Sequence, residues 1–295
     1  MSQRRIILYT NVDTDADFKM TRQVSEILKK NGWQTVLCPI SIDDSLEIDI
    51  SKITPPDGYK FATIENELAS AEMVITFGGD GTILRAARAA SDLGVPILGI
   101  NLGGKGFMAE LEAEDIGLLT SLADADYKKE TRIMIDVEVQ RDEKIISRDF
   151  ALNDVVIRGD NKVIDMTIYG DDQKITRFSG DGTVIATPTG STAYSMSAGG
   201  PIVDPAAKNI IITPICAHIL EARSFVLELG RVVTVEIGYK KVNPSYISVD
   251  GGSHTRVQIG DIIKVYKSKR TTQLVRLSDK SFFYKISSKL ISREV

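Results

Sequence analysis

The stretch that decides the fold is Phe77-Gly78-Gly79-Asp80-Gly81-Thr82. It ends the apolar run 73–77, which predicts a buried parallel strand, and it precedes the alanine-rich run 83–90, which predicts a helix. Three glycines around one aspartate let a ligand approach the backbone without meeting a Cβ atom. We expect Thr82 to cap the helix, whose first N–H groups then face an anion over the turn. The stretch therefore predicts a phosphate site with one carboxylate, that of Asp80.

A tight turn with a capping aspartate is the plainer interpretation of a lone Gly-Asp-Gly. The strand before the turn and the helix after it favour the phosphate site instead. The stretch differs from a Walker loop because no lysine follows its glycines.

The surrounding sequence alternates strands with helices. Strands are predicted over 4–10, 33–40, 73–77 and 96–100, and helices over 13–30, 65–71 and 83–90, with a connecting loop over 41–59. Asn31-Gly32 should end the first helix as a C-cap. Such alternation predicts a doubly wound parallel sheet that binds ligands at the carboxyl ends of its strands.

A second glycine-rich turn, 101–107, follows the strand at 96–100 and should flank the Asp80 turn at the same edge of the sheet. Phe107 closes it. Its ring is equally suited to stacking on an aromatic base or to filling a small satellite core.

The pattern changes near residue 128, where short alternating strands begin. We therefore predict three parts: an α/β domain over 1–127, a β-rich dinucleotide-binding domain over 128–275, and a tail over 276–295 that returns to the first domain. The tail has apolar residues at helical spacing between 282 and 290.

The β-rich part repeats the opening motif. Asp181-Gly182 runs into 185–201, a long stretch of small and hydroxyl residues between strands that is typical of a polar pocket lining, with Tyr194 able to stack or donate. A third Asp-Gly pair, Asp250-Gly251, is on its own typical of a β-hairpin turn. His254, four residues later, would face the site only if that turn does.

Composition narrows the class of protein. The 295 residues carry a net charge of −4, which argues against a nucleic-acid partner. The two cysteines, Cys38 and Cys216, are predicted to be free, buried thiols in a reducing compartment. No apolar run approaches the roughly 18 residues of a membrane span, and the N-terminus lacks a signal-peptide core. We expect a cytoplasmic protein without a membrane partner.

Taken together, these motifs resemble the NAD kinase family. The resemblance rests on Gly78–Thr82, Asn153-Asp154, Asp181-Gly182, the string Thr187-Pro188-Thr189-Gly190-Ser191-Thr192-Ala193-Tyr194 and Ser197-Ala198-Gly199-Gly200-Pro201, in that order over both domains. The first motif is shared with diacylglycerol and sphingosine kinases, so the specific signal is the string that begins at Thr187.

The resemblance implies a phosphotransferase that moves the γ-phosphoryl of ATP to the 2′-hydroxyl of the adenosine ribose of NAD, giving NADP, with a divalent cation such as Mg²⁺. It implies that Asp80 is catalytic and that the family usually forms homodimers or homotetramers. The residues it assigns to NAD binding are Gly79, Gly81, Thr82, Phe107, Asn153, Asp154, Asp181, Thr192, Ala193, Tyr194 and Ser197. The third Asp-Gly turn adds Asp250, Gly252 and His254 as weaker candidates, independently of the resemblance. No residue is assigned to the metal, which ATP phosphates and water would mostly hold.

Two stretches depart from the family pattern, Gly103-Gly104-Lys105 and Arg223-Ser224-Phe225. Two other functions compete with the kinase: a lipid kinase with the same first motif, and a non-catalytic dinucleotide sensor. The string at Thr187 argues against the lipid kinase, and Asp80 argues against the sensor. ATP or polyphosphate as donor, and NAD or NADH as acceptor, stay open.

Overall fold

The computed structural model describes residues 4–40, 53–103, 106–160, 162–219, 222–238, 244–278 and 280–291. Most of the predicted loop over 41–59, and Gly104 and Lys105, lie outside these ranges. The chain forms two compact units: unit 1 is Met1–Thr131 with Thr272–Val295, and unit 2 is Arg132–Thr271.

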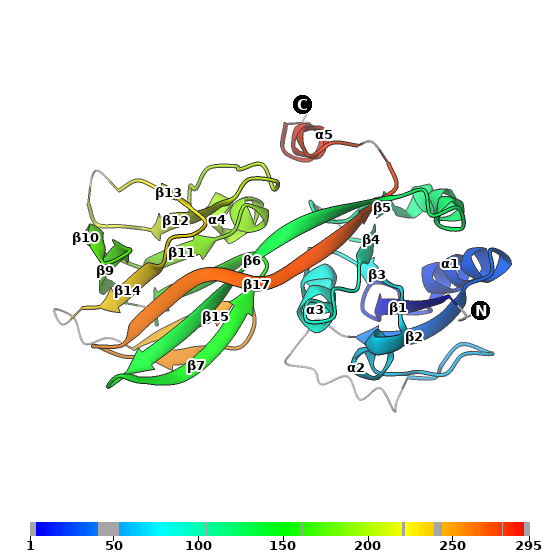
Figure 1. The fold of residues 1–295 in the computed structure, drawn as a ribbon, viewed down its shortest axis with the longest axis horizontal. Helices are drawn as coiled ribbons and strands as arrows, with labels where there is room; N and C mark the ends of the chain where they lie inside the picture. Colours follow the sequence, from blue (N-terminus) through cyan, green and yellow to red (C-terminus); the bar gives the residue numbers. More distant parts are fainter. Residues whose placement is uncertain are drawn as a thin grey trace. The chain divides into compact units, whose positions relative to one another are not determined.

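Unit 1 is built on a parallel sheet with the strand order β2-β1-β3-β4 (Figure 1). Its strands are β1 (Arg5–Asn11), β2 (Gln34–Ile40), β3 (Met73–Gly78), β4 (Ile97–Asn101) and the short β5 (Leu111–Glu112). The chain leaves β1 toward β2 on one side and continues from β3 to β4 on the other, so right-handed crossovers place helices on both faces. The predicted doubly wound parallel sheet is confirmed.

The helical segments of unit 1 connect these strands. They are α1 (Lys19–Lys30), α2 (Ile64–Glu67), η2 (Leu68–Ser70), α3 (Asp80–Ala90) and η3 (Ala113–Leu122). Helix α1 begins later than the predicted residue 13, because the Asp15 carboxylate accepts the backbone N–H groups of Met20 (3.1 Å) and Thr21 (3.0 Å) and so caps the helix from outside. It ends at Asn31-Gly32 as predicted, with Gly32 at φ +81°.

The core of unit 1 lies along the sheet. Every residue of β3 and β4 is buried, which explains why these strands read as continuous apolar runs rather than alternating ones. Leu8, Ile75, Leu98 and Ile100 are each fully buried there. The sheet is therefore a rigid platform, and the turns at its carboxyl edge are the parts available for function.

The C-terminal tail belongs to unit 1, as predicted, and forms α5 (Phe282–Ile286) and η5 (Ser287–Ile291). Its buried face differs from the one that apolar spacing suggested. Lys285 is the buried residue of α5, whereas Phe283 and Tyr284 are 67% and 57% exposed. The lysine is buried because its ammonium donates to the carbonyl of Ala109 at 2.7 Å.

Unit 2 consists of two antiparallel sheets around one core (Figure 1). One has the order β13-β12-β11-β8-β15-β16 and the other β7-β6-β17-β14-β9-β10. The strands are β6 (Lys128–Arg141), β7 (Lys144–Ala151), β8 (Asp154–Gly159), β9 (Ile164–Gly170), β10 (Gln173–Gly180), β11 (Gly182–Ala186), β12 (Asn209–Ile215), β13 (Phe225–Glu228), β14 (Val233–Ile237), β15 (Ser245–Val249), β16 (Thr255–Val257) and β17 (Ile262–Arg276). The predicted β-rich part is confirmed, with two short helices, η4 (Thr189–Thr192) and α4 (Tyr194–Ser197), after β11.

Both cysteines are free, but only Cys38 is buried. The prediction was wrong for Cys216, which is exposed in a left-handed turn (φ +46°) just after β12. Within the described residues, no helix combines the length and apolar character needed to cross a membrane.

Candidate active site

The Asp80 turn joins β3 to α3 at the carboxyl edge of the unit 1 sheet. Gly78 ends β3 at φ +153°, and a Cβ atom there would lie 2.3 Å from the hydroxyl of Thr82. Gly79 is the N-cap of α3 and Asp80 is its first residue. The predicted cap by Thr82 was wrong: Thr82 lies inside the first turn, fully buried, and its Oγ1 has no partner within the described chain.

The Asp80 carboxylate is held in one orientation by the second glycine-rich turn. The backbone N–H of Phe107 donates to Oδ2 at 2.9 Å, and that of Met108 donates to Oδ1 at 3.1 Å. A Cβ atom on Gly106 would lie 3.1 Å from Oδ1, so a glycine lets this backbone approach the carboxylate. The prediction that the two turns flank each other is confirmed, and Phe107 contributes through its backbone.

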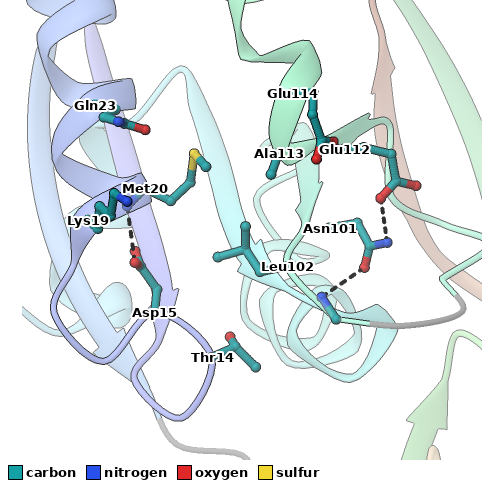
Figure 2. A pocket seen from close by; sticks show the side chains of 11 residues that line it. Thr14, Asp15, Lys19, Met20, Gln23, Asn101, Leu102, Glu112, Ala113 and Glu114 are labelled. Carbon is teal, nitrogen blue, oxygen red and sulfur yellow. Dashed lines mark hydrogen bonds between the residues drawn. The ribbon is translucent and has the colours of Figure 1, made fainter.

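A pocket of about 480 Å³ opens at the same edge of the sheet. Figure 2 shows Lys19 and Gln23 of α1 on one side of it, and Asn101, Glu112 and Glu114 on the other. Asn101 ends β4 opposite Gly78 of β3, and its amide donates to Glu112 at 2.7 Å. The pocket carries more carboxylates than ammonium groups, which makes it a poor site for a triphosphate.

In unit 2, the Asn153-Asp154 turn is held by the Asp250 turn. The Asp250 carboxylate accepts the backbone N–H groups of Leu152 (2.7 Å), Asn153 (2.7 Å) and Asp154 (3.0 Å). Asp250 and Gly251 both have positive φ, +49° and +71°, as a type I′ hairpin turn requires. The side chain of Asp250 therefore holds the Asn153-Asp154 turn in place.

Asp154 is 5% exposed and lies against the long hydroxyl-rich loop. Burial, and to a lesser extent the nearby Asp250 charge, raise the pKa of its carboxyl to about 7, although a backbone hydrogen bond from Tyr194 opposes both effects. Asn153 is 8% exposed, and its Oδ1 has no partner among the described residues. The turn thus combines the Asp154 carboxyl, whose pKa lies near neutrality, with the Asn153 amide oxygen, which accepts no hydrogen bond from the described residues.

The loop from 187 to 203 packs on this turn. The N–H of Thr187 donates to the carbonyl of Asn153 at 2.9 Å, and a Cβ atom on Gly190 would lie 2.1 Å from the same carbonyl. Two hydroxyls bond within the loop, Ser191 to the carbonyl of Pro188 and Thr192 to that of Thr189. Others bond outside it, since Thr187 donates to the carbonyl of Leu152. The candidate residues Thr192, Ala193 and Tyr194 are partly buried, and Ser197 is exposed. Unit 2 therefore brings Asn153, Asp154 and this loop together.

Other predicted residues lie apart from that group. Asp181 sits beyond Gly182 of β11, whereas Ala186 at the other end of that strand pairs with Asp154, so about 15 Å of strand separates the two aspartates. His254 is exposed and its ring lies against Tyr246, with centroids 4.4 Å apart. Gly252 closes the Asp250 turn by donating to the carbonyl of Val249 at 2.8 Å. Arg223 donates to the adjacent carbonyl of Ala222.

Sequence reasoning missed a set of residues that hold the Asp80 region from the other side. Glu110 is 4% exposed and accepts the N–H of Ser278 at 2.8 Å and a bond from Arg276 at 3.2 Å. Lys285 and Lys289 of the tail reach the same segment. The only signal in the sequence was a glutamate between apolar residues, which does not identify its partners.

The matches to known domains cover most of the chain. The ATP-NAD kinase N-terminal domain matches residues 6–127, and the ATP-NAD kinase C-terminal domain matches residues 152–277. The chain belongs to the NAD kinase family. The chain is therefore a phosphotransferase of this family, and the family membership excludes the lipid kinase as a competing assignment.

Relatives within the family extend over the whole chain. An NAD kinase from Ruminiclostridium cellulolyticum is 36% identical over 99% of both chains. One from Natranaerobius thermophilus is 43% identical over 75% of this chain and 78% of its own.

Two solved structures share the fold of the family. Yeast NADH kinase complexed with NADH has a TM-score of 0.83 at 24% identity, covering 100% of this chain and 89% of its own. An NAD kinase from Archaeoglobus fulgidus in complex with ATP has a TM-score of 0.70 at 23% identity, covering 98% and 100%.

Proposed function

We propose that this chain transfers the γ-phosphoryl of ATP to the 2′-hydroxyl of the adenosine ribose of NAD, forming NADP. The single observation that carries the proposal is the Asp80 carboxylate, fixed by two backbone N–H groups at the start of a helix and at the ligand-binding edge of a parallel sheet. Membership of the NAD kinase family supports the same reaction.

Asp80 is proposed as the general base. Each oxygen of its carboxylate accepts one backbone N–H and keeps a further lone pair, with which it can take the proton of a ribose hydroxyl. General-base assistance of this kind contributes about 10²–10⁴-fold to a rate. Because the two N–H groups fix the rotamer, the base needs no reorganisation when the hydroxyl arrives.

The donor is proposed to bind as MgATP. The N-terminus of α3 offers backbone N–H groups and a favourable dipole to a phosphate. The cation would be carried mostly by phosphate oxygens and water, as Mg²⁺ commonly is. The cation would neutralise charge on the transferred group.

The acceptor is proposed to bind unit 2 through Asn153, Asp154 and the loop that contains Thr192–Ser197. The unpartnered Oδ1 of Asn153 and the carboxyl of Asp154 are both suited to accept hydrogen bonds from ribose hydroxyls. The assignments of Gly79, Gly81, Thr82, Phe107 and Asp181 to NAD binding rest on the resemblance. Asp250, Gly252 and His254 stay weaker candidates for NAD binding, and Asp250 also holds the Asn153-Asp154 turn.

Three further properties are part of the proposal. The free thiols Cys38 and Cys216 suit a reducing compartment, so we place the protein in the cytoplasm. Its net charge of −4 favours small-molecule partners over nucleic acid. The family resemblance supports a homodimer or homotetramer.

The reaction is tested by incubating the purified protein with ATP, Mg²⁺ and NAD and measuring NADP. Parallel reactions replace ATP with polyphosphate, or NAD with NADH, and so decide the donor and the acceptor. Turnover that needs ATP and Mg²⁺ is expected. Tight NAD binding without NADP formation under any of these conditions would instead favour the non-catalytic sensor.

A further inference from the structure

The segment that holds Asp80 forms two sets of hydrogen bonds, one through its N–H groups and one through its carbonyl groups. We call residues 106–109 the Asp80 clamp, because the N–H groups of Phe107 and Met108 donate to the Asp80 carboxylate. Three of the four carbonyl groups in this segment, those of Gly106, Met108 and Ala109, are bound by cations near the C-terminus. Lys289 Nζ donates to the carbonyl of Gly106, Arg276 donates to that of Met108 at 3.0 Å, and Lys285 Nζ donates to that of Ala109 at 2.7 Å.

Lys289 acts on the peptide group that contacts Asp80 directly. The carbonyl of Gly106 and the N–H of Phe107 belong to one peptide unit, so the chain of hydrogen bonds runs from the Lys289 ammonium through this unit to Oδ2 of Asp80. Hydrogen bonds in such a chain polarise and strengthen one another. Loss of the ammonium should therefore weaken the bond that fixes the carboxylate.

Lys285 and Glu110 hold the other end of the clamp. The peptide unit that accepts from Lys285 at Ala109 donates, through the N–H of Glu110, to Gly99 of β4 at 2.9 Å. The Lys285 ammonium lies 3.6 Å from the buried Glu110 carboxylate. Burial, and to a lesser extent the charge of Arg276, lower the pKa of Lys285 to about 8, although the Glu110 carboxylate opposes both effects. Burying an amine is costly, and its carbonyl and carboxylate partners offset part of that cost.

We propose that the C-terminal tail is a positioning element for catalysis, in which Lys289 and Lys285 hold the Asp80 clamp so that Asp80 keeps one orientation. Lys285 lies in α5 and Lys289 in the following η5, and both ammonium groups reach the clamp. Lys289 is the more direct of the two, and its side chain is 20% exposed. The inference rests on the proposed role of Asp80 as the base.

The test compares Lys289→Met with Lys280→Met. Lys280 lies in the same tail but forms a more exposed pair with Asp115 at 2.8 Å, away from the clamp. We expect Lys289→Met to lower kcat by about 10-fold or more while KM for NAD and for ATP stays within about twofold, because orientation is lost rather than binding. Lys289→Arg should recover most of the rate, and Lys280→Met should keep the wild-type rate.

A second measurement needs no turnover. Hydrogen exchange of the Phe107 amide, followed by NMR, should be about 10-fold faster in Lys289→Met than in the wild type, since its acceptor is held less firmly. If the wild type makes no NADP, the proposed function fails and this exchange rate still decides the positioning role. Should Lys289→Met not fold, Lys289→Gln, which keeps a neutral donor, replaces it.

The proposal is overturned by Lys289 variants that keep both the wild-type kcat and the wild-type Phe107 exchange. It is equally overturned if Lys280→Met lowers kcat as much as Lys289→Met, because a general loss of tail packing would then explain both. A loss confined to KM would also contradict it.

Discussion

Asp80 and Asp250 sit in turns that look alike in the sequence and differ in the structure. Each follows a strand, precedes a glycine and accepts backbone N–H groups: Asp80 from two residues of unit 1, and Asp250 from three consecutive residues of unit 2. Asp80 begins a helix, whereas Asp250 occupies a left-handed position in a hairpin turn. Each Asp80 oxygen has one N–H partner among these bonds, but Asp250 Oδ1 has two, which uses both of its lone pairs.

The difference teaches how to separate a reactive carboxylate from a structural one. Where each carboxylate oxygen receives only one donor, both oxygens keep a lone pair, and the group is oriented and still able to take a proton. One that receives converging donors from a single turn holds that turn in place. We therefore expect mutation of Asp80 to lower mainly the activity, and mutation of Asp250 to lower mainly the stability.

The largest expected effect is on turnover in Asp80→Asn. The amide keeps the side-chain volume but accepts no proton, so kcat should fall at least about 10²-fold while KM for NAD stays within several-fold. Only one of the two clamp N–H groups loses its acceptor, which costs about 1 kcal/mol of unfolding free energy. Steady-state kinetics and a thermal melt on the same preparation measure both. Near wild-type turnover would remove Asp80 from the mechanism.

Many of the contacts that distinguish Asp80 from Asp250 could not be predicted from the sequence, for physical reasons. The strand over 73–77 and the turn after it were predictable because apolar runs and glycines act locally. The approach of Phe107 to Asp80 followed from a general rule, since carboxyl ends of parallel strands share one edge.

The remaining contacts depend on strand register and tertiary packing. Asp250 meets residues 152–154 only because β15 pairs with β8. Asp181 repeats the Asp80 motif, yet β11 places it at the opposite end from the Asn153-Asp154 turn. Lys285 and Lys289 have the spacing of an ordinary solvated helix face, so their hydrogen bonds to the clamp had no sequence signal.

A smaller effect is expected from Asp250→Ala, mainly on stability. The substitution leaves three backbone N–H groups of residues 152–154 without their acceptor and should lower the unfolding free energy by about 2 kcal/mol, even though it removes a charge that faces Asp154. KM for NAD should rise, because the loosened turn carries Asn153 and Asp154. Denaturant unfolding with parallel kinetics tests this. An unchanged midpoint together with a kcat loss like that of Asp80→Asn would make Asp250 catalytic and end the contrast.

A third effect is the pH dependence that Asp154 gives to stability. Burial, and then the charge of Asp250, raise the pKa of its carboxyl from 3.8 to about 7 in the folded protein. Between these two values the folded state binds more protons at this site than the unfolded state does. The contribution of Asp154 to stability is therefore fully present below about pH 4, falls as the pH rises, and is lost above about pH 7.

Asp154→Asn removes this titration, because its amide does not ionise. The thermal midpoint of the variant relative to the wild type should therefore rise between pH 4 and pH 7 and level off above, by several degrees in total. Asp172→Asn is the matched control, since Asp172 is exposed in a left-handed turn that asparagine also adopts readily. A difference that stays flat from pH 4 to pH 8, or that Asp172→Asn reproduces, would mean that Asp154 is ionised throughout. Asp154 and Asp250 would then both be permanently charged. The hydrogen bonds from Asp250 would hold the Asn153-Asp154 turn against the repulsion between these two carboxylates.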